Sequence, residues 1–310
     1  MGAVAAAGGN RRERLGYVTE RRGFLATFLI SPAILFIAAL VGAPLVLAVY
    51  LSFTDATAGS ITGRWIGLAN FRSAVHDPIF RGALWHTFFF TLVSQAVVIL
   101  CAGLLAHALV RSFRGRWILR FFVLLPWAAP IALTAIGFLW FYDPQASIWN
   151  WFLVHLHIVD RSHVPNWLGT PKAAMSSIIT VQAWRTIPFA TVIFLAGIAS
   201  IPQEVDDAAA IDGATGLRKF WHVSLPLQLP IAIVAVLFGI IFTATDMVVP
   251  YILTNGGPFN STQVLTTYAF ATGINAGNIG EGAAIALFML PILAFVAIGM
   301  LVFARRAEVT

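Results

Sequence analysis

Two residues of opposite charge lie in or beside long apolar stretches of the chain. Arg185 interrupts an otherwise uncharged run from Ala173 to Gln203, and Asp246 follows an uncharged run from Phe220 to Thr245. Charged groups are costly inside a membrane, and they usually face a cavity or a partner. Such residues can bind a polar substrate, relay protons or ions, or form a structural ion pair. The sequence leaves these three roles open.

Other side chains that could support chemistry lack the required spacing. Four candidate metal ligands crowd one loop, but residues two apart do not share a helix face, so we expect no metal site. These are His155, His157, Asp160 and His163. Neither Lys172 nor Lys219 follows a glycine, so the chain has no phosphate-binding loop of its own. No Ser/His pair or carboxylate pair within the apolar stretches indicates an intramembrane enzyme.

The composition predicts that these residues are held by membrane-spanning helices. Hydrophobic residues make up 59% of the chain and charged residues only 10%, which is typical of membrane proteins. A span needs about 20 apolar residues, and six stretches satisfy this. We therefore expect an all-α membrane protein of six transmembrane helices, near Phe24 to Phe53, Leu84 to Val110, Phe121 to Tyr142, Ala174 to Ser200, Leu229 to Leu253 and Ala283 to Ala304.

The basic residues predict the orientation of these spans. Thirteen Lys and Arg residues lie on the side of both termini, against five on the other side. Positively charged loops resist translocation, so we expect both termini in the cytoplasm. The net charge of +6 then follows from topology and anionic headgroups, and does not require nucleic acid. We expect a disordered, basic N-terminus over residues 1–23, a transmembrane domain over 24–306 and a short cytoplasmic tail over 307–310.

The loop between the fourth and fifth predicted spans, residues 201–228, has a distinctive pattern. Pro202 can begin a helix, the acidic residues after it suit a helix N-terminus, and Gly213 permits a turn before a second short helix. Ala208 to Ala210 would form a low surface that another protein can approach closely. The alternative is an amphipathic loop helix on the membrane surface.

This loop resembles the EAA motif of ABC importer permease subunits. That motif is EAA, three residues, Gly, nine residues, Ile, one residue and Leu-Pro. Asp stands here for Glu and Val for Ile, so charge and branching are kept. The resemblance implies a coupling helix that docks on a nucleotide-binding subunit. The corresponding residues are Asp207, Ala208, Ala209, Gly213, Val223, Leu225 and Pro226, and we include Asp212 beside the glycine.

A second motif follows the fifth predicted span. The Leu-Thr-Asn-Gly-Gly-Pro stretch from Leu253 resembles the carbohydrate-importing branch of that family, which includes maltose, glycerol-3-phosphate and trehalose permeases. Without its position in the chain it would be an ordinary turn. The chain lacks the large outer insertion of the maltose subunit, so it looks closer to the other two types. The turn residues are Asn255, Gly256, Gly257 and Pro258.

Together the two motifs imply a permease subunit with the type I ABC importer fold, in the cytoplasmic membrane of a prokaryote. The cargo would be a disaccharide such as trehalose or maltose, or glycerol-3-phosphate. Alignment with the maltose subunit implies that the substrate path contains Arg185, Thr186, Phe189, Gly239, Thr243 and Asp246.

The resemblance also implies the partners. These are a second, similar permease subunit, two ATP-binding subunits that hold ATP and Mg, and an extracytoplasmic sugar-binding protein. The chain itself would bind no cofactor. An ion-coupled secondary transporter is the alternative, because Arg185 and Asp246 could serve as its relay.

Overall fold

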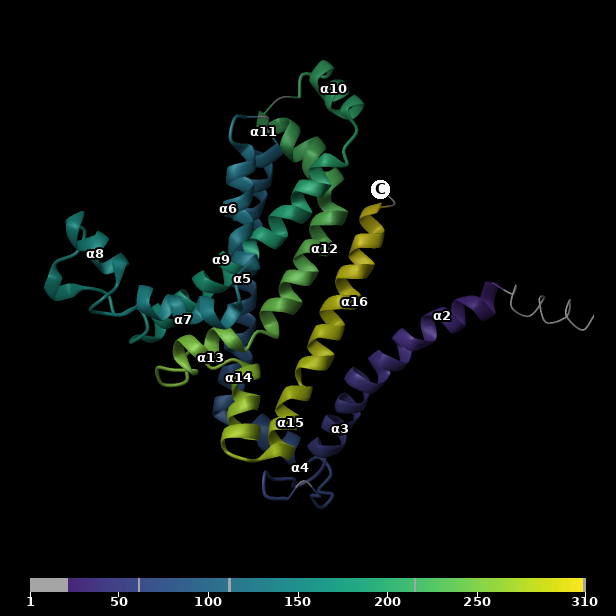
Figure 1. The fold of residues 1–310 in the computed structure, drawn as a ribbon, viewed down its shortest axis with the longest axis vertical. Helices are drawn as coiled ribbons and strands as arrows, with labels where there is room; N and C mark the ends of the chain where they lie inside the picture. The colour runs from purple at the N-terminus through teal and green to yellow at the C-terminus, as the bar shows by residue number, and fades with distance from the viewer. Residues whose placement is uncertain (1–21, 61, 111–112, 215, 309–310) are drawn as a thin grey trace, which may run out of the picture.

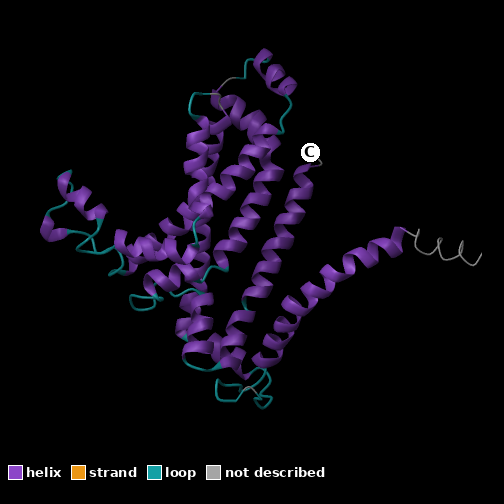
Figure 2. Ribbon diagram, in the orientation of Figure 1, coloured by secondary structure: helices purple, strands orange, loops and turns teal. Residues whose placement is uncertain are grey.

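The computed structural model describes residues 22–60, 62–110, 113–214 and 216–308, and these are almost entirely helical (Figures 1 and 2). Within these ranges the extended pairings are two isolated bridges, Thr54 with Trp65 and Thr57 with Ser60. The tail expected over residues 1–23 lies almost wholly outside the described residues. The predicted all-α class is confirmed.

Five continuous helical segments are long and apolar enough to cross a membrane, and a bent pair makes a sixth. The first combines α2 (Arg22–Ile37), η1 (Ala38–Gly42) and α3 (Ala43–Ser52). The second is α5 (Pro78–Val110) and the fourth is α9 (Pro171–Ala199). The fifth joins η3 (Phe220–Ser224) to α12 (Leu225–Ala244), and the last joins α15 (Ile279–Leu287) to α16 (Met289–Glu308).

The third predicted span, Phe121 to Tyr142, is not a single helix. It is divided between α6 (Arg116–Ala128) and α7 (Ile131–Phe141), whose axes differ by 100°. Pro130 disfavours helical geometry at Ala129, which is extended with ψ 138°. The stretch predicted as one span is therefore built from two helices that meet at a sharp bend.

The fifth predicted span also ends earlier than expected. Helix α12 stops at Ala244, nine residues before the predicted end at Leu253, and α13 (Val248–Thr254) is a separate helix. The Asp246 carboxylate accepts a hydrogen bond from the backbone N–H of Val249 at 3.2 Å, in the first turn of α13. A short acidic side chain satisfies an unpaired N–H group at this position. The charged residue thus lies at the break between two helices.

The remaining short helices lie at the ends and sides of the bundle (Figure 1). They are α4 (Ala69–His76), α8 (Ile148–His155), η2 (Arg161–His163), α10 (Gln203–Ile211), α11 (Gly216–Lys219), α14 (Leu265–Phe270) and η4 (Ala271–Asn275). Helix α10 is at one end of the bundle and α4 at the other, while α8 stands apart and α2 leans away. We call these two ends the α10 end and the α4 end.

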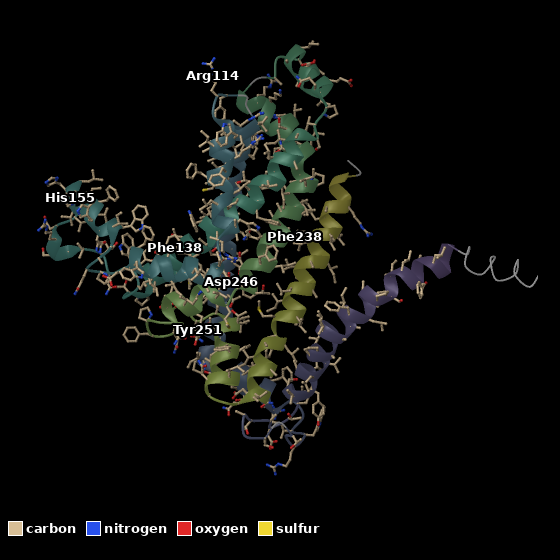
Figure 3. All side chains as sticks on the ribbon, viewed as in Figure 1. Arg114, Phe138, His155, Phe238, Asp246 and Tyr251 are labelled. Atoms are coloured by element: carbon tan, nitrogen blue, oxygen red, sulfur yellow. The ribbon has the colours of Figure 1, made fainter. Side chains whose placement is uncertain are left out.

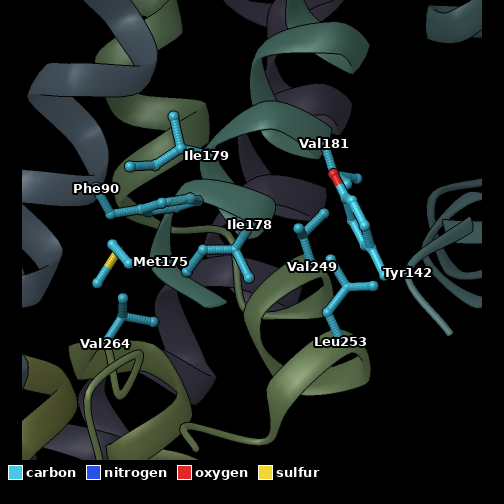
Figure 4. Packing of buried hydrophobic residues seen from close by; sticks show 9 residues of the cluster. All are labelled: Phe90, Tyr142, Met175, Ile178, Ile179, Val181, Val249, Leu253 and Val264. Carbon is cyan, nitrogen blue, oxygen red and sulfur yellow. The ribbon is translucent and has the colours of Figure 1, made fainter. Parts of the chain in front are cut away.

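The core is built around α9, which packs on α5, α6 and α12. One apolar cluster joins α5, α9 and α13 (Figure 4). Its buried members are Phe90, Tyr142, Met175, Ile178, Ile179, Val181, Val249, Leu253 and Val264. A second cluster between α5, α9 and α12 contains Ala102, Ala106, Ala183, Ala190 and Ala235. Small residues let helix backbones approach closely in a membrane.

The α4 end fastens the first span to the last. The side-chain amide of Asn70 donates to the backbone oxygens of Ser52 (2.9 Å) and Thr54 (2.8 Å). A side chain at Gly280 would collide with the backbone oxygen of Thr54, and one at Gly282 would collide with the backbone of Gly273. These glycines therefore allow backbone-to-backbone contact that a larger residue would prevent.

Candidate functional site

Arg185 of α9 and Asp246 after α12 meet inside the bundle. Nη2 of Arg185 lies 2.7 Å from Oδ2 of Asp246, so the two side chains form a charge-assisted hydrogen bond. Figure 3 shows Asp246 between the two ends of the bundle. Of the roles that the sequence left open, the structural ion pair is formed in this structure.

The ion pair belongs to a longer polar chain that joins three spans. Arg185 Nη2 donates to Oε1 of Gln182 (3.5 Å), and Nε2 of Gln182 donates to Oγ1 of Thr243 (3.3 Å). Gln95 of α5 donates to the same hydroxyl at 2.9 Å. Gln95, Gln182 and Thr243 are all buried. Buried polar groups need such partners, so the network fixes how α5, α9 and α12 approach one another.

Gln95 and Gln182 were not among the residues predicted from the sequence. The predicted residues are charged or align with positions of a relative, whereas these two are uncharged. Their signal was an amide side chain within a long apolar run, because polar residues inside spans usually face the bundle interior. Gly239 also acquires a role, since a side chain there would occupy the position of the Gln95 amide.

The six residues predicted for the substrate path separate into two groups. Arg185, Asp246, Thr243 and Gly239 belong to the polar network or contact it, and the buried Thr186 donates to the backbone oxygen of Gln182 at 2.7 Å. Phe189 lies one helical turn further along α9, in an aromatic group. It stacks on Trp127 with 4.9 Å between ring centroids, and it meets Phe238 and Phe242 edge-on.

The loop that resembles a coupling element projects from the α10 end (Figure 1). Helix α10 begins after Pro202, and Gly213 has φ +74°, the left-handed conformation that favours glycine. Asp207 and Asp212 are exposed, and Ile211 is 87% exposed although it is apolar. Val223 lies in η3, while Leu225 and Pro226 begin α12. The loop therefore connects an exposed helix directly to the fifth span.

One member of this motif is placed differently from our expectation. Ala209 is only 6% exposed, so this chain itself already covers its side chain. Ala208 and Ala210 are exposed beside it. The low surface expected at Ala208 to Ala210 is thus presented by the two outer residues, and Ala209 packs inward.

The Asn255 to Pro258 segment forms a tight turn between α13 and α14. Asn255 and Gly256 have φ +47° and +82°. The Thr262 hydroxyl donates to the backbone oxygen of Gly257 at 2.6 Å, which closes the turn. Phe259, the next residue, is 93% exposed.

In the described part of the chain, no three His, Cys, Asp or Glu side chains converge in a way that could hold a metal ion. His155 stacks on Trp151 with 3.9 Å between ring centroids. His163 shares a hydrogen bond of 3.0 Å with the Ser162 hydroxyl.

Comparison with known proteins identifies related transport components. The family described as "Binding-protein-dependent transport system inner membrane component" matches residues 98–309. The sulfoquinovosyl glycerol transport system permease protein SmoG of Agrobacterium fabrum is 30% identical over 86% of this chain and 85% of its own length. The trehalose/maltose transport system permease protein MalF of Thermococcus litoralis is 34% identical over 72% of this chain and 74% of its own.

Solved structures share the fold. A chain of a bacterial ABC transporter that imports the acidic polysaccharide alginate superposes with a TM-score of 0.79, at 20% identity, over 94% of this chain and 99% of its own. The same transporter in complex with an alginate pentasaccharide-bound periplasmic protein gives a TM-score of 0.78 at 20% identity, over 94% of this chain and 98% of its own.

Proposed function

The chain belongs to the family of binding-protein-dependent transport system inner membrane components, and from this we propose that it forms half of the translocation pathway of an ABC importer for carbohydrates. The family consists of multi-pass transport components and not of enzymes. The observation that carries the proposal is the pairing of an exposed helix joined directly to the fifth span with a buried polar network between the spans. The exposed helix can receive movement from an ATPase, and the polar network can bind a polar cargo.

A carbohydrate cargo is supported by the relatives. These relatives are named for the transport of trehalose and maltose, sulfoquinovosyl glycerol, or alginate. For this chain we propose a disaccharide such as trehalose or maltose, or glycerol-3-phosphate. The pathway would contain Arg185, Phe189 and Asp246, with Thr186, Gly239 and Thr243 behind them.

The first span supports a second permease subunit as a partner. Only 6% of the most apolar 18-residue stretch of this span is buried within this chain, and α2 leans away from the bundle (Figure 1). In a complex, a second subunit of the same family would cover part of this span. The neighbour solved with a periplasmic protein supports a sugar-binding protein as a further partner.

One of the two ATP-binding subunits would dock on the loop 201–228, and these subunits would hold the ATP and Mg. The thirteen basic residues flanking the spans on the side of the termini support a cytoplasmic position for the α10 end in a prokaryotic cell. Residues 24–306 then form one permease domain, with a cytoplasmic N-terminus and a short tail over residues 307–310.

Transport in proteoliposomes tests this function. The complete complex should import trehalose or maltose when ATP is supplied to the ATPase subunits, and an ion gradient alone should not drive import. Import driven by an ion gradient without ATP would instead establish the secondary transporter.

Variants of the loop test the coupling role. Gly213→Pro cannot adopt the observed φ, Asp207→Lys reverses an exposed charge on α10, and Ile211→Asp removes its exposed apolar contact. Each should lower sugar-stimulated ATP hydrolysis and retention of the ATPase subunits while the permease still inserts. Asp160→Lys, a charge reversal in another exposed loop, is the matched control and should leave both unchanged. Parental ATP hydrolysis and import in all three loop variants would exclude a coupling helix.

A further inference from the structure

We infer that the pathway half formed by this chain selects uncharged sugars over acidic ones, because Asp246 already compensates the charge of Arg185. This inference rests on the proposed function, and it narrows the proposed cargo to the uncharged disaccharides, so that it excludes the anionic glycerol-3-phosphate. It separates the chain from its structural neighbour, whose cargo is an acidic polysaccharide.

The charges of Arg185 and Asp246 compensate each other. The Arg185 guanidinium lies 2.7 Å from the Asp246 carboxylate, whose side chain is only 3% exposed, against 16% for Arg185. At that distance and burial each charge is largely neutralised by the other. A carboxylate or phosphate on the cargo would have to displace Asp246 from its partner, and a buried carboxylate without a partner is strongly unfavourable.

The other described cations lie near the ends of the helices or in loops. In the described ranges, every other Lys or Arg lies in a loop or within two turns of a helix end, for example Arg81, Arg120, Lys172 and Arg305. Arg185 is the described cation that lies midway along a span. This half of the pathway therefore offers an acidic cargo no uncompensated positive charge between its two ends.

Arg185 also has a hydrogen-bond donor that is available to a cargo. The Nε of Arg185 is buried and has no hydrogen-bond partner among the described residues, although Nη2 has two. Buried donors are normally paired, so an unpaired one invites an acceptor. A hydroxyl or ring oxygen of a sugar can accept from Nε without disturbing the charge balance. The site thus retains a donor while its net charge is zero.

An aromatic group lies beside the ion pair. Phe189 follows Arg185 by one turn of α9, and Trp127 and Phe242, which contact it, are 40% and 38% exposed. The faces of aromatic rings carry partial negative charge. They suit the apolar face of an uncharged sugar ring and disfavour a carboxylate. This arrangement agrees with the neutral ion pair.

A double-mutant cycle tests the inference on the reconstituted complex of both permease subunits, the ATPase subunits and the binding protein. The probe is radiolabelled trehalose or maltose, whichever the binding protein binds. Arg185→Gln and Asp246→Asn each leave one buried charge unpaired, so each should lower ATP-driven uptake at least about tenfold. The double variant has no charge and keeps an amide donor, so its uptake should exceed that of either single variant.

Two results would overturn the inference, and neither depends on the proposed function failing. One is a double variant no faster than the faster single variant, which would mean that the Arg185 charge itself binds cargo. The other is parental import of a glucuronic acid disaccharide that the binding protein also binds, at a rate equal to that of the uncharged sugar. This comparison needs no variant, so it holds even if a substitution prevents assembly, which gel filtration would show. Absence of any ATP-driven sugar import by the parent would instead refute the proposed function.

Discussion

The two ends of the bundle differ in how firmly the chain is tied together. At the α4 end, Asn70 holds the end of α3, Gly273 meets Gly282, and Tyr268 of α14 donates to the carboxylate of Asp77. At the α10 end of the described chain the side-chain hydrogen bond between spans is longer, since Nη2 of Arg120 donates to the backbone oxygen of Leu109 at 3.3 Å. His107 of α5 meets Phe220 edge-on with 5.1 Å between ring centroids, and α10 presents mostly exposed side chains.

This difference indicates which end of the bundle can move more readily. Contacts through backbone and buried hydrogen bonds resist separation, whereas exposed elements with few buried contacts open at low cost in free energy. An ATPase pulling on α10 would therefore move the α10 end, while the α4 end serves as the fixed point.

The largest effect is expected from filling the closest contact at the α4 end. Gly282→Ala places a methyl group against the backbone of Gly273, which cannot move aside as a flexible side chain could. Overpacking of this kind should cost about 3 kcal/mol of unfolding free energy. Gly299→Ala in α16 is the matched control, since nothing lies within 4 Å of its new methyl group. Equal thermal stability of the two purified variants would contradict close backbone packing at the α4 end.

Removal of the Asn70 side chain should have a smaller effect. Asn70→Ala leaves the backbone oxygens of Ser52 and Thr54 without their amide donor. An unsatisfied buried acceptor costs about 1–3 kcal/mol, and we expect about 2 kcal/mol in a denaturation experiment. Gln145→Ala, at an exposed position, is the control and should change stability little. A loss no greater than that of the control would show that Asn70 does not fasten the first span.

Hydrogen exchange should distinguish the two ends without any substitution. Backbone amides of α10 and α11 should exchange at least about tenfold faster than those of α14 and α15, because locally less stable elements open more often. Mass spectrometry of the purified permease chain without the ATPase subunits measures this, because a docked subunit would itself protect α10. Equal protection at both ends would contradict the contrast.

The smallest effect is expected from Tyr268→Phe. Burial and the hydrogen bond to the neighbouring Asp77 carboxylate together raise the pKa of Tyr268 to about 12. A raised pKa favours the neutral phenol in the folded protein, so this stabilisation is present below about pH 10 and is lost as the pH rises toward 12. The variant should lose about 1 kcal/mol at neutral pH, and its stability should fall less between pH 10 and 12. Parallel stability curves for parent and variant would exclude this contribution.

Much of the fold could be predicted from the sequence, because length and lack of charge are sufficient to locate spans. The family and the ABC importer permease fold, inferred from two motifs, are confirmed by the comparisons. The breaks were harder to predict. Pro130 and Asp246 both lie in stretches apolar enough to continue as helices, and whether such residues bend or end a helix depends on neighbouring helices.

Less of the candidate site could be predicted. Arg185 and Asp246 stood out because charges are rare in spans, but their pairing depends on how α9 and α12 pack. Gln95 and Gln182 carry no charge, so composition did not separate them from other polar residues. Ala209 was expected to face a partner, and only the packing of α10 shows that it faces inward. The roles of these residues in transport stay predictions.

The fastening of the first span at the α4 end has a mechanical consequence. The span from Leu25 to Ser52 has 28 residues, so at 1.5 Å per residue it is a lever about 42 Å long. Its pivot is where Asn70 and Gly280 hold the end of α3. A rotation of about 10° around that pivot would carry the far tip through about 7 Å, more than the pitch of one helical turn. A small rotation at the pivot is thus enlarged into a displacement of the tip that exceeds the pitch of one helical turn.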